Sequence, residues 1–141
     1  MGLSEPSMDQ WLKEAKEDPC ASQVGMYLTH NGVVRATPRH IVRSNEYAPT
    51  DSTSSSSDDV IAVAFSYDHD GLQQALAEAR TWEGIYYVRA WLAEGNVAVG
   101  ESLMYVLIGA DIRPHAIDAL TRLVGHIKNN LVTETEIYAT N

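Results

Sequence analysis

Hydrophobic positions divide the chain from residue 60 onward into alternating strands and helices. Three apolar runs and one alternating segment predict strands at residues 60–67, 85–93, 103–110 and 131–139. Apolar residues at helical spacing predict helices at residues 70–82 and 112–129, with a turn at residues 95–100. The order βαββαβ predicts an α+β fold with a two-layer core of the ferredoxin-like or hammerhead type.

The first third of the chain predicts an extra helix and extra strands outside this core. Apolar residues recur at helical spacing over residues 8–17, and Ser7 is a suitable N-cap with Gln10 as its capping-box partner. Residues 24–36 form either one long strand or a hairpin that turns at Asn31-Gly32. We therefore expect one domain over residues 1–141, with an N-terminal helical extension at residues 1–22.

A polar segment with four consecutive serines occupies residues 44–59. Its composition contains too little apolar surface to form a core, so we expect a flexible loop. Loops of this length are either disordered or functional, and the serine run favours disorder.

Composition and charge narrow the classes of function. The chain has 141 residues and a formal net charge of −9, which argues against nucleic acid or an anionic membrane as the main partner. No apolar run approaches the roughly 20 residues that a membrane helix needs, and the polar start lacks the features of a signal peptide. Cys20 is the single cysteine, so no internal disulfide can form. These features predict a cytoplasmic protein.

Basic residues gather in two segments of this acidic chain. No Asp or Glu occurs in residues 19–45, and Asp118 is the one acid in residues 112–133. The basic residues in these segments are Arg35, Arg39, His40, Arg43, Arg113, His115, Arg122, His126 and Lys128. Two basic segments suit an anionic small ligand or the carboxylate of a partner protein. Chance clustering is the alternative.

Three of these residues occupy positions suited to binding or catalysis. Arg35 follows a strand and can hold a phosphate through its bidentate guanidinium, or it is simply solvated. Arg113 follows the N-cap candidate Asp111, where the helix dipole disfavours a cation unless an anion or an ion pair compensates it. Lys128 ends the same helix, where it either complements the dipole or acts as a partly desolvated amine.

Geometry separates two of these candidates. Arg113 and Lys128 lie fifteen positions apart, which is about 22 Å on an unbroken helix. One small ligand cannot contact both from the same chain. Either two chains build one site, or one of the two residues has another role.

The sequence predicts no metal site and no cofactor. The five histidines show no i,i+4 pair and no His-Glu-x-x-His pattern. No phosphate-binding glycine loop, dinucleotide fingerprint or nucleophile elbow occurs. Cys20 has no activating partner in the sequence, so we expect an unreactive thiol.

Four segments of the chain carry a resemblance to a known family. They are THNGVVRATPR, GNVAVGE, LMYVLIGADIRPHAIDALTRLVGHIK and the last strand, and in this order they resemble the large subunit of molybdopterin synthase. Residues 32–35 match that family's Gly-x-Val-Arg motif, and residues 95–101 match its Gly-x-Leu-x-Val-Gly-Glu turn. Ile112-Arg113 stand at its His-Arg pair, and Ile127-Lys128 at its Leu-Lys pair. The resemblance covers residues 24–136 and depends on the order and spacing of the motifs.

The resemblance implies a function in molybdenum cofactor biosynthesis. Members of the family transfer sulfur from the C-terminal thiocarboxylate of a small ubiquitin-like subunit to cyclic pyranopterin monophosphate, and they form homodimers that bind two small subunits. By the resemblance, Lys128 is the catalytic lysine, and Arg35 and Arg113 bind the phosphate or the pterin. Arg39 and His126, from the two basic segments, are further candidates for substrate binding.

Several positions depart from the family pattern. Ile112 replaces the histidine, Leu92-Ala93 replace a His-Arg pair, and the second lysine falls near Thr135 in an alternating strand with two glutamates. Three hypotheses therefore stay open. The chain is a sulfur-transferring enzyme, or a non-catalytic dimeric module of the same fold that binds a small carrier protein or an anion, or an unrelated ferredoxin-like ligand-binding dimer.

Overall fold

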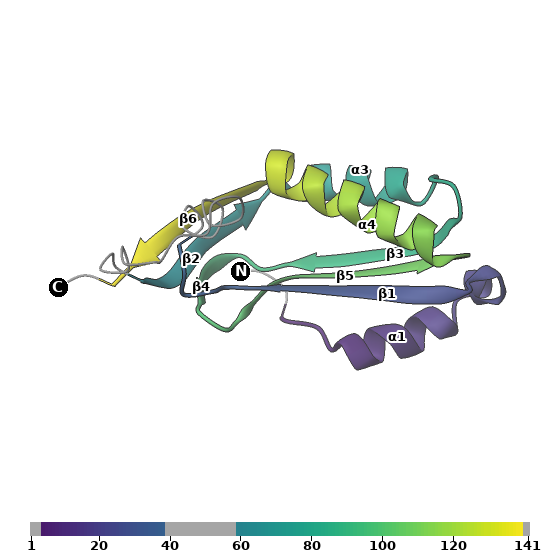
Figure 1. Cartoon of the computed structure of the whole chain (residues 1–141), viewed down its shortest axis with the longest axis horizontal. Helices are drawn as coiled ribbons and strands as arrows, with labels where there is room; N and C mark the ends of the chain where they lie inside the picture. The colour runs from purple at the N-terminus through teal and green to yellow at the C-terminus, as the bar shows by residue number, and fades with distance from the viewer. Residues whose placement is uncertain (1–3, 39–58, 140–141) are drawn as a thin grey trace, which may run out of the picture.

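The computed structural model describes residues 4–38 and 59–139. The predicted core elements are all present in the predicted order (Figure 1). The N-terminal elements are α1 (Met8–Lys16), the short 3-10 helix η1 (Pro19–Gln23) and β1 (Met26–Val33). The remaining elements are β2 (Val60–Tyr67), α3 (His69–Ala79), β3 (Ile85–Leu92), β4 (Gly95–Ala98), β5 (Ser102–Ala110), α4 (Arg113–His126), the π-helical turn η3 (Ile127–Leu131) and β6 (Val132–Tyr138).

In the described residues, six strands form two antiparallel sheets, in the orders β1-β5-β3 and β4-β2-β6. Figure 1 shows α3 and α4 on one face of the first sheet and α1 on the opposite face, while the second sheet extends from one end. The predicted α+β class is confirmed. The segment predicted as a turn at residues 95–100 contributes β4, because its backbone pairs with β2 from Ala62 to Phe65.

One long strand, and not a hairpin, spans the Asn31-Gly32 pair. β1 pairs with β5 along its whole length, from Met26 opposite Ala110 to Val33 opposite Ser102. The Asn31 side-chain amide donates to the Ser102 hydroxyl and to the Met104 carbonyl, both at 3.1 Å. These cross-strand contacts use the asparagine that would otherwise favour a turn.

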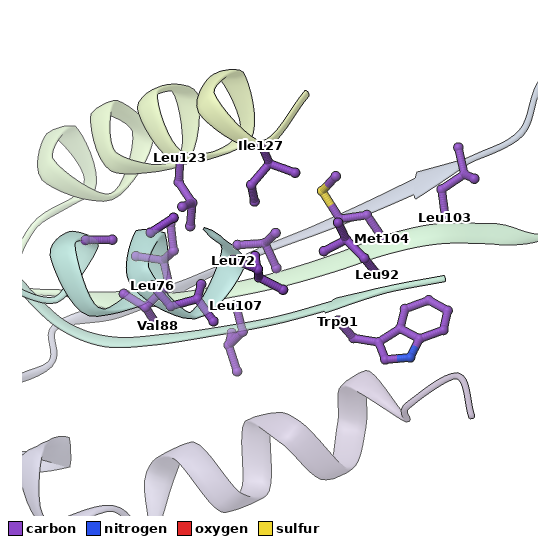
Figure 2. Close-up of a cluster of buried hydrophobic side chains, with 14 of the residues drawn as sticks. Leu72, Leu76, Val88, Trp91, Leu92, Leu103, Met104, Leu107, Leu123 and Ile127 are labelled. Atoms are coloured by element: carbon purple, nitrogen blue, oxygen red, sulfur yellow. The ribbon is translucent and has the colours of Figure 1, made fainter. Parts of the chain in front are cut away.

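The main core lies between the first sheet and the pair α3 and α4. β5 is the central strand, and its Val106, Leu107 and Ile108 are fully buried. In Figure 2, Leu123 of α4 and Ile127 of η3 point toward the sheet, while Leu107 and Trp91 lie on the side of α1. Burying an aliphatic side chain of this kind contributes roughly 1.5–3 kcal/mol. Ile127 therefore fixes the C-terminal end of α4 onto the sheet.

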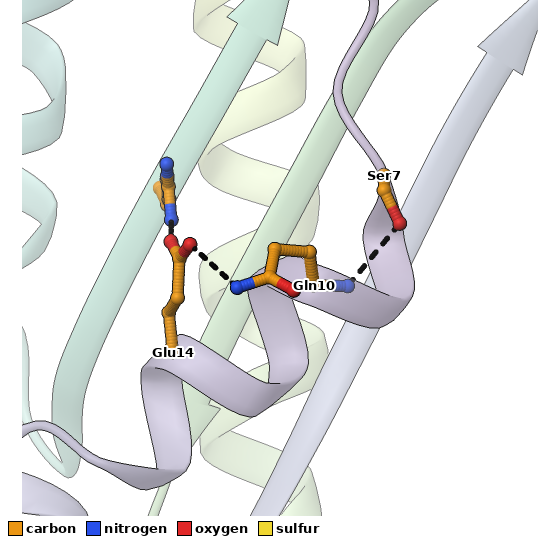
Figure 3. Close-up of polar contacts among 4 residues, drawn as sticks. Ser7, Gln10 and Glu14 are labelled. Carbon is orange, nitrogen blue, oxygen red and sulfur yellow. Dashed lines mark hydrogen bonds and ion pairs between the residues drawn. The ribbon is translucent and has the colours of Figure 1, made fainter.

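A polar chain of contacts fixes α1 on its face of the sheet. The Ser7 hydroxyl accepts a hydrogen bond from the Gln10 backbone amide at 3.2 Å, which confirms Ser7 as the N-cap. The Gln10 side chain donates to Glu14 at 3.0 Å instead of completing a capping box (Figure 3). Arg89 of β3 donates to Glu14 at 2.6 Å, and its guanidinium lies 4.5 Å from the ring centre of buried Trp11.

Some predictions fall on residues outside the described ranges. Arg39 lies outside them, as does the serine-rich segment at residues 44–59 except for Asp59. Over residues 4–38 and 59–139, no helix is long and apolar enough to cross a lipid bilayer.

Candidate functional site

A small pocket lies where the end of the first sheet meets the second sheet. Its volume is ≈ 60 Å³. Four charged side chains line it, namely Arg35, Lys128, Glu134 and Glu136. Val33, Val34, Val63 and Leu103 supply its apolar wall. The pocket therefore joins β1, β2, β5, η3 and β6, and it brings together two of the predicted site residues that are far apart in the sequence.

The glycine turn between β4 and β5 holds Arg35 in place. The Val34 amide donates to the Glu101 carbonyl at 3.1 Å, and the Gly100 amide donates to the Val34 carbonyl at 2.8 Å. Gly100 has a φ of +89°, a conformation that glycine adopts without steric cost. Just beyond Arg35, the Val60 amide donates to the Ala36 carbonyl at 2.8 Å. Backbone hydrogen bonds at Val34 and Ala36, on both sides of Arg35, thus fix the backbone of Arg35 just after the end of β1.

Lys128 lies in a π-helical turn that widens the end of α4. The sequence predicted an α-helix as far as residue 129, but residues 127–131 form η3 instead. Its first residue, Ile127, is buried and packs against the core. The Asp68 amide donates to the Leu131 carbonyl at 2.8 Å, which anchors the far end of the turn to the start of α3. π-Helical turns inserted at the end of α-helices are frequent at functional sites. Lys128 thereby points toward β6.

The Lys128 ammonium forms an ion pair with Glu134 across the pocket. The Lys128 Nζ atom lies 3.1 Å from the Glu134 Oε1 atom, and the two side chains are 34% and 9% exposed. Glu134 and Glu136 are two residues apart on β6, so their side chains lie on the same face of that strand. Two cations and two carboxylates thus share the pocket, which limits the cost of removing each charge from water.

His30 of β1 lies near this pocket, and sequence reasoning did not select it. Burial, together with the positive charge of Lys128, lowers the pKa of His30. Both effects favour the neutral form of the imidazole. His30 precedes Gly32 of the Gly-x-Val-Arg motif by two residues, so the two lie on the same face of the strand. This spacing was the one feature of the sequence that could have pointed to His30.

The other predicted residues lie elsewhere. Arg113 is exposed at the first position of α4, at the opposite end of that helix from Lys128. His126 is exposed, its Nδ1 lies 3.1 Å from Asn130 Nδ2, and it lines a separate groove between α3 and α4 with Trp82 and Arg122. Arg39 lies outside the described residues. One chain therefore assembles Arg35 with Lys128, but not with Arg113 or His126.

The start of α4 differs in detail from the prediction. Asp111 stands one residue before the N-cap, which is Ile112 and provides no side-chain bond. The Asp111 carboxylate accepts from the Ile112 amide at 2.6 Å and contacts the His115 ring. A β-branched N-cap is tolerated because the residue before it satisfies a backbone donor.

The single cysteine has the properties of an unreactive thiol. Burial in η1, with a further contribution from a hydrogen bond to Asp18, raises the pKa of Cys20 to about 11. The thiolate is the nucleophilic form, and it is scarce at neutral pH under these conditions. In the described part of the chain, no group of three or more His, Cys, Asp and Glu side chains is arranged to hold a metal ion.

Comparisons with known proteins support the fold assignment. No protein-family model matches the sequence, and no curated protein resembles it closely enough to count as a relative. Among solved structures, molybdopterin synthase from Staphylococcus aureus has a TM-score of 0.69 at 14% identity, over 99% of this chain and 90% of that chain. The molybdopterin cofactor biosynthesis protein E from Burkholderia multivorans has a TM-score of 0.65 at 16% identity, over 98% and 88%.

A third similar structure comes from a complex. It is the protein–protein complex of subunits 1 and 2 of the molybdopterin-converting factor from Helicobacter pylori, with a TM-score of 0.60 at 16% identity over 99% of this chain and 86% of that chain. All three matches span nearly the whole of this chain. The chain therefore has the fold of these three proteins.

Proposed function

We propose that this protein is a large subunit of molybdopterin synthase. It would take sulfur from the thiocarboxylate tail of a small ubiquitin-like subunit and transfer it to cyclic pyranopterin monophosphate in the cytoplasm. The observation that carries the proposal is the meeting of Arg35, Lys128 and the residues 95–101 turn at one place. These three segments carry the motifs that resemble the family, and an accidental resemblance gives no reason for them to converge.

The charges at the pocket suit the two proposed substrates. The Arg35 guanidinium can bind a phosphate through two parallel hydrogen bonds. The Lys128 ammonium can hold the anionic end of a tail and stabilise the charge on oxygen when the acyl carbon is attacked. In each transfer, a bond forms between sulfur and a substrate carbon while a carbon–oxygen bond at that carbon breaks, and the released oxygen takes up a proton. Water then hydrolyses the acyl–sulfur bond, so the tail ends in a carboxylate and the sulfur stays on the substrate.

A second copy of the chain would complete the site. Arg113 lies at the other end of α4 from Lys128, so it cannot contact the same small ligand within one chain. A homodimer that places Arg113 of one copy beside Lys128 of the other would unite them. A small-subunit partner is supported by the Helicobacter pylori structure, which is a complex of two different subunits.

One observation favours a second candidate, a non-catalytic dimeric module that binds a carrier protein or an anion. The second lysine expected near Thr135 is absent, Thr135 is exposed, and the neighbouring Glu134 occupies the pocket instead. A carboxylate in place of an ammonium weakens the attraction for a doubly anionic substrate. Binding of the small subunit without sulfur transfer would identify this function.

A single-turnover assay distinguishes the candidates. The chain is mixed with thiocarboxylated small subunit and cyclic pyranopterin monophosphate, and dithiolene product is measured for the wild type and for Lys128→Ala. Lys16→Ala is the matched control, because Lys16 is an exposed lysine in the last turn of α1. Product that is lost only in Lys128→Ala supports the enzyme. Tight binding without product supports the module, and neither product nor binding refutes both.

A further inference from the structure

The Lys128–Glu134 pair occupies the position at which an anionic ligand would meet the lysine. Glu134 Oε1 lies 3.1 Å from the ammonium, within hydrogen-bonding distance. The carboxylate is 9% exposed while the lysine is 34% exposed. The lysine is therefore accessible from the pocket side, and its inner side is already satisfied by a carboxylate of its own chain.

The size of the pocket makes this pairing a competition. A volume of ≈ 60 Å³ has room for a few water molecules, so an anion that enters lies close to every charged group of the lining. A carboxylate that enters to reach Lys128 also approaches Glu134, and Glu136 lines the same pocket. Like charges at such distances repel, and the repulsion is stronger in a partly buried site than in water. An entering anion therefore has to separate Glu134 from the lysine or tolerate that repulsion.

We propose that Glu134 is a built-in competitor for Lys128, which excludes weakly held anions and yields only to a carboxylate or thiocarboxylate tail that a docked partner protein presents. This inference rests on the proposed function and adds a mechanism of selection to it. A tail tethered to a docked partner has a high effective concentration at the pocket, whereas a free anion does not. Competition from Glu134 would thus favour a tail held in place by a docked partner over a free anion.

Binding measurements with two forms of the small subunit test this mechanism. One form ends in a free carboxylate and the other in an amide, and both are titrated by calorimetry into the wild type, Glu134→Gln, Lys128→Ala and Glu17→Gln. Glu134→Gln removes the competing charge and keeps the shape of the side chain. Glu17→Gln makes the same change of net charge at an exposed position at the end of α1, remote from the pocket in sequence.

We expect Glu134→Gln to bind the carboxylate form about fivefold more tightly than the wild type, which corresponds to the upper end of the range for ion pairs that remain partly exposed. Binding of the amide form should not change. Lys128→Ala should lose the preference for the carboxylate form, because Glu134 and Glu136 then repel that form without the lysine to attract it. Glu17→Gln should match the wild type. Acetate, the untethered probe, should compete measurably with the carboxylate form in Glu134→Gln and not in the wild type.

Two results would overturn the inference, and they are distinguishable. If the wild type prefers the carboxylate form but Glu134→Gln binds it no more tightly, Glu134 only supports the lysine and the proposed function stands. If the wild type binds neither form, the proposed function fails and the inference fails with it. Circular dichroism checks that the variants are folded. If Glu134→Gln does not fold, Glu134→Met, with an uncharged side chain of similar length, is used to repeat the test.

Discussion

The Asp111 Oδ1 atom lies 2.7 Å from the His115 Nδ1 atom, so the residue that precedes the N-cap of α4 is bonded to the first turn of that helix. On its other side, the His115 ring lies 3.9 Å from Glu83. The hydrogen bond to Asp111 raises the pKa of His115, and the same bond lowers the pKa of Asp111. The start of α4, where Arg113 is exposed, therefore depends on the charge of this pair.

The pair should make stability depend on pH in a defined direction. His115 stabilises the fold fully below its ordinary pKa of 6.5, and this contribution is lost as the pH rises through its raised value. Asp111 contributes above its ordinary pKa of 3.8, and this is lost as the pH falls through its lowered value. Both contributions are present together between these two ordinary values.

We expect His115→Gln to lower the melting temperature near pH 5.5, and to lower it less at a pH above the raised pKa of His115, where the pair has already lost its charge. Asp111→Asn should have a similar profile, and the double variant should lose little more than either single one. Thermal unfolding followed by circular dichroism measures this. A loss in His115→Gln that is equal at both pH values would show that the ring acts through packing alone.

Gly84 is required by the close approach of this pair. Its φ is +76°, and a Cβ atom there would collide with the Asp111 carboxylate and the His115 ring. Gly84→Ala should destabilise the fold by about 1–3 kcal/mol. Gly125→Ala is the matched control, because Gly125 lies inside α4 with open space around it and should stabilise by roughly 0.4–1 kcal/mol. Urea denaturation of both variants checks the opposite signs.

The attachment of α1 should depend more on Trp11 than on the ion pair beside it. Trp11→Ala empties a buried site and should cost about 3–5 kcal/mol. Arg89→Met loses the pair with Glu14 and the stacking on Trp11, which are both partly exposed, so we expect a loss of roughly 1 kcal/mol. Lys16→Met, at an exposed position on the same helix, should have almost no effect. Chemical denaturation of the three variants gives the ranking, and an Arg89→Met loss that equals the Trp11→Ala loss would contradict it.

The imidazole of His30 should report on the charge of Lys128. Since that charge and burial together lower its pKa, Lys128→Ala should raise the pKa of His30 toward 6.5 but not to it, because burial remains. Titration of the His30 ring protons by NMR in the wild type and in Lys128→Ala measures the change. An unchanged His30 would place Lys128 away from β1. Because its pKa is lowered, His30 stabilises the fold fully above its ordinary pKa of 6.5, and this stabilisation is lost as the pH falls through the lowered value.

The pattern of apolar positions predicted the class and order of the elements, but it did not predict how the strands divide between two sheets. Period and length specify a strand, whereas pairing depends on long-range contacts. The Asn31-Gly32 pair illustrates this difference, because a strong local turn signal is overridden by the pairing of β1 with β5. β4 shows the reverse case, since a glycine-bounded turn became a strand once β2 lay beside it.

The pocket itself was not predicted, but two of the residues that line it were selected from the sequence. Arg35 and Lys128 were selected from their motifs, and the structure places both at one pocket. The inward direction of Glu134 was not predicted, because β6 alternates two threonines with two glutamates, and neither face is clearly apolar. Only the position of β6 beside η3 decides that the glutamates face the lysine. Arg113, His126 and Arg39 remain predictions.

The hydrogen bond between the Val60 amide and the Ala36 carbonyl has a practical consequence for protein engineering. Ala36 and Val60 lie far apart in the sequence, and this bond brings their backbones together. The entropic cost of closing a loop rises only with the logarithm of its length, by about 0.6 kcal/mol for each doubling. An affinity tag or a small foreign domain inserted between these two residues should therefore add only a small entropic cost to the closing of this contact.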